Sequence, residues 1–314
     1  MTTPEALGRR IEAATSALGA TVAWDWRGEL HRRGRAPRGR TTAGGAGRLL
    51  PTADGWVAVQ LPRPGDVELV PAWLALASAE GSSMADAVSR ASGARLAEAA
   101  ELVGLAVGVL GERRPDATGG VRVLGRRPRP LRRPIRVVDL SALWAGPLCG
   151  AILAAAGCDV TKVEAVDRPD GARLGDPDLF AELNASKAHR SVDLRTELGE
   201  LVRSADVVIE ASRPRALAAL GVHVHHGPAV WVSITGHGRA SNRIAFGDDA
   251  AVAGGLVDHD ADGPTFRGDA LADPLSGLAA AATALELLAS GEGGLVEVAM
   301  AGVAAAHAHA PQPV

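Results

Sequence analysis

Short apolar runs alternate with helix-like segments through the second half of the chain. The apolar runs cover residues 135–141, 159–165, 191–194, 205–211, 229–236 and 295–300. Between them, segments 148–156, 196–204 and 276–289 carry the Ala- and Leu-rich pattern typical of helices. Strands that are apolar on both faces are typical of a parallel sheet covered by helices on each side. This pattern predicts an α/β domain with a mostly parallel sheet.

The first part of the chain has a different pattern, which predicts a smaller α+β domain. We expect a helix over residues 4–18, a strand over 56–61 after the Asp54-Gly55 turn, and two or three helices over 70–110. Three prolines then follow within residues 128–134. Proline lacks a backbone N–H and interrupts helices and central strands. We therefore place the boundary near residue 133, with domains at 1–133 and 134–314.

Composition narrows the class of protein. The chain has 314 residues, 47% of them hydrophobic, and no run long enough to cross a membrane is uninterrupted by Gly, Pro or charge. The N-terminus lacks the apolar core of a signal peptide. Cys149 and Cys158 are too few for a disulfide framework. These features predict a cytoplasmic enzyme that is neither exported nor membrane-inserted.

Charge is unevenly distributed along the chain. The net charge of −3 and the absence of Tyr argue against a nucleic-acid binder. Arginines gather in two runs, at residues 31–40 and 125–136. Pro and Gly interleave them, so each run is most simply a solvated loop or linker. The functional alternative is a patch for an anionic ligand, such as the phosphates of a nucleotide.

Most familiar catalytic and binding motifs are missing. Neither G-x-G-x-x-G nor a P-loop follows the first apolar run of the second domain, and G-x-S-x-G does not occur. Gly146-Pro147 there allows a ligand to approach a helix N-terminus, although an ordinary strand-to-helix loop has the same composition. The histidines at 223–226 lie among Gly and Pro without partner ligands, which predicts a surface loop and no metal site.

The carboxylates are more informative. Asp248 and Asp249 are adjacent, and Asp269 and Asp273 come directly before the helix predicted at 276–289. The simplest role for Asp273 is a helix cap or a first-turn charge. The alternative is a nucleophile, because a carboxylate is ionised at neutral pH and a helix N-terminus supplies N–H donors. Local chemistry leaves both roles open.

Six blocks of sequence, taken in order, resemble the family III coenzyme A (CoA) transferases. That group includes formyl-CoA and carnitine-CoA transferases and 2-methylacyl-CoA racemase. The blocks are VVDLSALWAGPLCGAILAAAGCDVTKVEA, LNASKAHRSVDLRT, ADVVIEASRPRALAALGV, WVSITGHGR, AFGDDAAVAGGL and GDALADPLSGLAAAATALELLASGEGGLVEVAM. The resemblance implies a Rossmann-like domain, a cytoplasmic homodimer, and acyl-CoA and a carboxylic acid as substrates.

The resemblance also assigns residues. Asp273 matches the family's nucleophilic aspartate, which carries CoA as an aspartyl thioester between two acids. Residues matching the family's CoA contacts are Trp144, Ala145, Arg168, Arg213 and Arg215, with the arginines facing phosphates. Lys187 and Arg190, in the block resembling N-x-x-K-R-S, are further candidates.

The chain departs from the family pattern in two ways. Racemases of the family carry His in a Gly-His-Asp triplet where this chain has Asp248. The missing imidazole favours transfer over racemisation. Asp248 is then expected to be a polar group of the active site or a general base. Segments resembling the family's small domain precede the Rossmann-like domain instead of following it. Two alternatives stay open: an acyl-CoA racemase or epimerase, and a noncatalytic CoA-binding or partner subunit.

Overall fold

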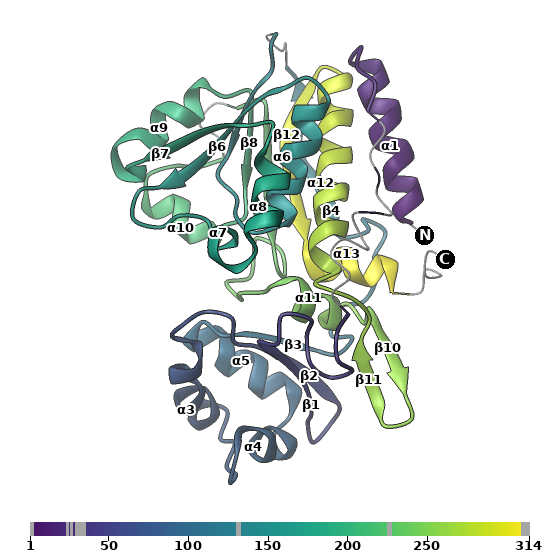
Figure 1. Ribbon diagram of the computed structural model, residues 1–314, viewed down its shortest axis with the longest axis vertical. Helices are drawn as coiled ribbons and strands as arrows, with labels where there is room; N and C mark the ends of the chain where they lie inside the picture. Colours follow the sequence, from purple (N-terminus) through teal and green to yellow (C-terminus); the bar gives the residue numbers. More distant parts are fainter. Residues whose placement is uncertain are drawn as a thin grey trace.

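A seven-stranded sheet forms the centre of the larger part of the protein (Figure 1). The computed structural model describes residues 3–22, 25, 28, 36–129, 133–224 and 228–308. The strand order is β4-β12-β9-β8-β5-β6-β7. Their bounds are β4 (Val121–Pro128), β5 (Arg136–Asp139), β6 (Asp159–Ala165), β7 (Ala188–Val192), β8 (Val207–Glu210), β9 (Val230–Thr235) and β12 (Glu292–Ala299). All pairs are parallel except β4 with β12.

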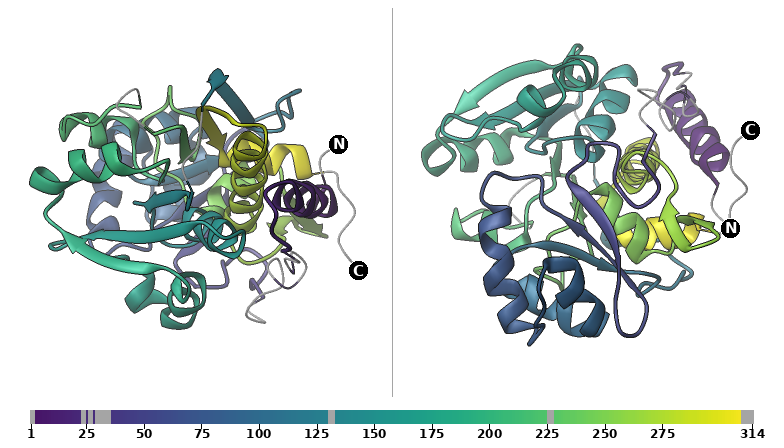
Figure 2. Two further views of the ribbon diagram at one scale, coloured as in Figure 1. Left: turned by 90° about the horizontal axis from the view of Figure 1, so that it is seen from above. Right: turned by 60° about the horizontal axis from the view of Figure 1, so that its bottom comes forward.

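Helices cover both faces of this sheet, as the apolar strands predict. One apolar cluster joins the sheet to α6 (Ala145–Ala155) and α12 (Ala272–Ala289), and another joins the opposite face to α9 (Leu194–Ser204). α1 (Pro4–Ala17) packs along α12, as both views in Figure 2 show. The remaining helices of this large unit are α7 (Ala172–Gly175), α8 (Pro177–Asn184), α10 (Pro214–Ala219), α11 (Gly247–Ala253) and α13 (Met300–His307). The predicted α/β class is confirmed.

A small unit is built on a second, antiparallel sheet. Its strands are β1 (Gly47–Pro51), β2 (Trp56–Gln60) and β3 (Ala106–Val109), in that order. Trp73 and Leu96 anchor the apolar cluster between this sheet and α3 (Asp66–Leu76), α4 (Met84–Arg90) and α5 (Gly93–Val103). α11 packs against β2 and β3, and lies between the two units in Figure 1. A hairpin of β10 (Val257–Asp260) and β11 (Gly263–Phe266) contacts β1.

The structure does not divide at residue 133 as predicted. α1 packs on α12, and β4 is an edge strand of the large sheet, so segments before residue 133 belong to both units. β4 was not predicted because the arginines in it are typical of a loop. An edge strand tolerates such charged residues because it is exposed to solvent. There Arg122 and Arg126 pair with Glu297 and Glu292 of β12. Residues 31–35 of the first arginine run lie outside the described residues.

Two further expectations need correction. Residues 106–109 form β3, where the sequence pattern predicted helix. α12 begins at Ala272, four residues before the predicted start, so Asp273 lies inside its first turn. Within the described chain, no helix is both long and apolar enough to cross a bilayer.

Candidate active site

The predicted site residues gather where strands of the large sheet end and helices begin. α6 starts shortly after β5, Arg168 follows β6, and Arg213 follows β8. Ligands of α/β proteins bind at this carboxyl edge of a parallel sheet. The small unit lies below α11 at one end of the large unit in Figure 1.

The start of α6 touches the second turn of α12. A Cβ on Gly277 would lie 2.6 Å from the Ala145 carbonyl oxygen, so only glycine allows this approach. Asp273 lies four residues before Gly277, on the same face of α12. The predicted CoA loop, at Ala145, therefore contacts α12 one turn after the predicted nucleophile.

Asp273 does not cap its helix. The N-cap of α12 is Leu271, and no side chain makes a capping hydrogen bond there. The Asp273 carboxylate instead accepts a hydrogen bond from the backbone N–H of Gly247, at the start of α11. A Cβ on Gly247 would lie 2.5 Å from Asp273 Oδ2 and 2.4 Å from the Ala270 carbonyl oxygen. The site requires glycine here because the backbone meets the carboxylate directly.

Carboxylates crowd this end of α12. Burial first, and then the negative charges of Asp248 and Asp269, raise the pKa of Asp273 to about 7, against the opposing effect of the Gly247 N–H. Burial also raises the pKa of Asp248 to about 6, against hydrogen bonds from the Ala270 backbone and the Gln60 side chain. Asp248 and Asp273 therefore change charge close to neutral pH, where groups that act on substrates are useful.

Four arginines lie close together, three from two segments of the large unit and one from the small unit. Burial lowers the pKa of Arg213, and the positive charges of Arg215, Arg63 and Arg168 lower it further. Arg63 comes from the loop after β2 and also pairs with Asp66 at 2.6 Å. The sequence did not single out Arg63, because only the fold brings the small unit here. Gathered guanidinium groups are a site for a polyanion such as a phosphate.

A hollow of about 480 Å³ opens beside Arg168. Its wall includes Asp193, Leu194 and Arg195, at the start of α9, and Leu220. Arg195 was missed as a candidate, although the sequence carried a signal. A basic residue in the first turn of a helix is unfavourable beside the positive end of the helix dipole, which indicates that it has another role, such as binding an anion.

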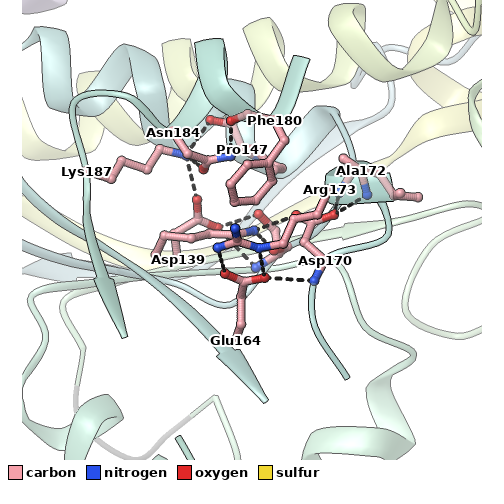
Figure 3. A network of polar contacts seen from close by, with 12 residues as sticks. Asp139, Pro147, Glu164, Asp170, Ala172, Arg173, Phe180, Asn184 and Lys187 are labelled. Carbon is pink, nitrogen blue, oxygen red and sulfur yellow. Dashed lines mark hydrogen bonds and ion pairs between the residues drawn. The ribbon is translucent and has the colours of Figure 1, made fainter. Parts of the chain in front are cut away.

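Lys187 is a structural cation and not a contact for CoA, contrary to the prediction. Its buried Nζ donates to Asp139 Oδ2, the Pro147 carbonyl and Asn184 Oδ1, each at 2.8 Å (Figure 3). An ammonium has three donors, so none remains for a ligand. The bond to Pro147 holds the first turn of α6.

A second buried cation fixes the loop between β5 and α6. Lys162 Nζ binds the Ser141 carbonyl and, at 2.8 Å, Asp170 Oδ2. Asp170 Oδ1 accepts from the backbone N–H of Leu143 at 3.0 Å. Leu143 has a φ of +69°, a strained value for a non-glycine residue. The network therefore shapes the turn that ends at Trp144, the buried N-cap of α6.

This network was visible in the sequence as charges within apolar strands. Asp139 ends the first strand and Lys162 lies inside the second, and isolated charges at buried positions need partners. The partners themselves, Asp170 and Asn184, could not be inferred from spacing. Glu164, next to this network, accepts hydrogen bonds from the Asp170 backbone and from Arg173 (Figure 3).

Arg190 lies apart from these groups. It is on the edge strand β7 and pairs with Glu197 of α9 at 2.9 Å. Of the three histidines at 223–226, His223 lies among the described residues, whereas His225 and His226 lie outside them. Across the described part of the chain, no group of three or more His, Cys, Asp or Glu side chains is arranged to hold a metal ion.

Comparisons with known proteins place the chain in a family. The family model described as CoA-transferase family III matches residues 133–312. A succinyl-CoA–D-citramalate CoA-transferase of Chloroflexus aurantiacus is 30% identical over 200 residues, which cover 55% of this chain and 50% of that protein. A succinate–glutarate CoA-transferase of Agrobacterium fabrum is 32% identical over 214 residues, covering 56% and 54%.

Solved structures give the same result. A CAIB/BAIF family protein from Brucella suis superimposes with a TM-score of 0.50 and 27% identity, over 57% of this chain and 55% of that one. The chain spans about half the length of the curated relatives it matches. The family model nevertheless covers more than half of this chain, including α6, α11 and α12. The chain therefore belongs to CoA-transferase family III.

Proposed function

We propose that this protein exchanges CoA between an acyl-CoA and a carboxylic acid, with Asp273 as the nucleophile. The observation that carries the proposal is the setting of Asp273. Its partly buried carboxylate accepts the Gly247 N–H and lies one turn before Gly277, the residue of α12 that packs on Ala145. Membership of the family supports CoA transfer as the reaction.

The exchange balances without any added reactant. Asp273 attacks the thioester carbonyl and the C–S bond breaks. CoA leaves as a thiolate, and the acyl group stays on Asp273 as a mixed anhydride. The thiolate then attacks the aspartyl carbonyl, which releases the donor acid and leaves an aspartyl-CoA thioester. An acceptor carboxylate repeats these two steps in reverse, so Asp273 is regenerated. Each step exchanges one acyl bond for another, as covalent catalysis requires.

The arginine cluster gives the CoA phosphates a place in this proposal. Arg168, Arg213 and Arg215 come from loops at the carboxyl edge of the sheet, as does the turn at Ala145. The hollow lined by Arg168 and Arg195 extends the same surface. Cations there neutralise phosphates, while the thioester end of the ligand reaches toward Asp273.

Arg213→Ala and Arg215→Ala are each expected to raise KM for acyl-CoA about tenfold, the loss of one charge-assisted contact, and to leave kcat nearly unchanged. Steady-state kinetics with acyl-CoA and with the corresponding acyl-pantetheine, which lacks the nucleotide, measure the effect. Only the CoA substrate should respond. Arg190→Ala is the matched control and should change neither KM. An equal effect on both substrates would contradict a phosphate role.

The rate of transfer is expected to fall as pH drops through about 7, because burial raises the pKa of Asp273 to about that value. Only the ionised carboxylate attacks a thioester. The dependence of kcat/KM on pH reports ionisations of the free enzyme. A rate that stays constant from pH 8 down to the ordinary range of aspartate, about 4, would contradict the assignment.

An exchange assay tests the function itself. Succinyl-CoA is incubated with a panel of acids including citramalate and glutarate, chosen from the names of the relatives, and new thioesters are identified by mass spectrometry. A new acyl-CoA is the expected result. Two other outcomes would overturn the proposal: deuterium entering the acyl α-carbon without an acceptor acid, which indicates a racemase, or CoA binding without any turnover.

A further inference from the structure

A glutamine of the small unit reaches the carboxylate beside Asp273. Gln60 is the last residue of β2, and its side chain is buried. Gln60 Nε2 donates to Asp248 Oδ2 at 2.9 Å. The two residues are 188 positions apart in the sequence, so this contact exists only because the small unit packs on α11.

Two glycines fit the small sheet around Gln60 and against α11. On β1, a Cβ on Gly47 would lie 2.5 Å from Gln60 Oε1, so glycine makes room for the side chain. On β3, Gly108 allows the strand to approach α11, since a Cβ there would lie 2.2 Å from the Asp249 carbonyl oxygen. The small sheet is therefore fitted against α11, with Gln60 pointing at Asp248.

Asp248 in turn holds the start of α12. Its Oδ1 accepts from the backbone N–H of Ala270 at 2.9 Å. Ala270 has a φ of +50°, and its carbonyl accepts from the Asp273 N–H at 2.8 Å. A non-glycine residue keeps such a φ only when its surroundings impose it. Contacts thus run without a gap from Gln60 through Asp248 and Ala270 to Asp273.

The charges that face Asp248 are negative. Asp269 and Asp273 approach it from the α12 side, and Asp249 neighbours it on α11 with its Oδ1 turned to the Phe246 N–H. From β2 comes the neutral amide of Gln60, and from β3 Gly108, which has no side chain. Arg243 acts on Asp249. Stabilisation of Asp248 as an anion therefore depends on the donors at Gln60 and Ala270.

We propose that Gln60 is a positioning residue, through which the small unit holds Asp248 against the turn that begins α12 and thereby tunes the reactivity of Asp273. This inference rests on the transfer reaction proposed above. It also gives the small unit a part in catalysis: without Gln60, Asp248 loses its side-chain donor, and the turn that carries Asp273 is less constrained.

Two near-isosteric variants test the inference with shifts of opposite sign. Gln60→Met removes the donor, so Asp248 keeps its proton to higher pH, repels Asp273 less, and lets Asp273 ionise at lower pH. Gln60→Glu places a second carboxyl group beside Asp248, so near neutral pH the pair carries more negative charge than Asp248 alone, and Asp273 ionises at higher pH. The acidic limb of kcat/KM against pH should move down in the first variant and up in the second. We also expect kcat of Gln60→Met to fall about tenfold, with KM for acyl-CoA unchanged.

The control is Arg48→Ala, an exposed position on neighbouring β1, which should leave the pH profile as in the wild type. Unmoved limbs in both Gln60 variants, or shifts of the same sign, would overturn the positioning role. If Gln60→Met does not fold, the direction of the limb in Gln60→Glu decides alone. Absence of CoA exchange in the wild type would instead overturn the proposed function, so the two failures are distinguishable.

Discussion

Asp273→Asn is expected to lower kcat for CoA transfer by at least about 10³-fold, the order of loss when a covalent nucleophile is removed. The amide keeps the size of the side chain but cannot form the anhydride or the aspartyl thioester. Single-turnover measurements with radiolabelled acyl-CoA would quantify the loss separately from binding. KM is expected to change little, because the phosphates are held elsewhere.

Stability provides the check that Asp273→Asn has folded. Burial raises the folded-state pKa of Asp273 to about 7, so its protonated form favours folding, and this contribution is lost as pH rises from about 4 through about 7. The asparagine variant should therefore melt at least as high as the wild type above neutrality. Asp269→Asn is the matched control and should keep transfer within about tenfold. Wild-type activity in Asp273→Asn would contradict the assignment.

Lys187→Met is expected to lower the free energy of unfolding by about 3–5 kcal/mol, because it leaves a buried carboxylate without its cation. Lys187 and Asp139 are completely buried, 2.8 Å apart. The substitution also frees the Pro147 carbonyl and Asn184 Oδ1. Urea unfolding followed by circular dichroism measures the loss.

Two companions separate the buried pair from a general effect of losing charge. Arg190→Met breaks an exposed pair with Glu197 and should cost under about 1 kcal/mol. Asp139→Asn combined with Lys187→Met removes both charges and should recover part of the lost stability. Equal losses in Lys187→Met and Arg190→Met would show that the buried network does not stabilise this loop.

Helices and strands could be predicted where the apolar pattern of their own residues defines them. β6 covers residues Asp159–Ala165 as expected, and α9 and β8 agree closely with the predicted segments, whereas β7 (Ala188–Val192) begins three residues before the strand expected at 191–194. β4 was missed because its alternating arginines face solvent at a sheet edge, where they pair with glutamates of β12. The sequence pattern placed the start of α12 at residue 276, four residues late, although Pro274 is well suited to the first turn of a helix.

The parts of the candidate site that could be predicted are those whose residues are neighbours in the sequence. Residues within one loop, such as Trp144 and Ala145, keep their relation in the fold. Lys187 was misjudged because a basic residue looks the same in sequence whether it binds a ligand or a buried Asp139. Gln60 and Arg63 carry no signal, since their importance depends on how the small unit packs on α11.

The most direct test of the account is to trap the aspartyl-CoA thioester. The protein is incubated with acyl-CoA, treated with hydroxylamine, digested and analysed by tandem mass spectrometry. Hydroxylamine converts an aspartyl thioester to a hydroxamate, and the account predicts this modification at Asp273, dependent on acyl-CoA and absent from Asp273→Asn. Transfer activity without a hydroxamate at Asp273, or with one at another carboxylate such as Asp248, would contradict it.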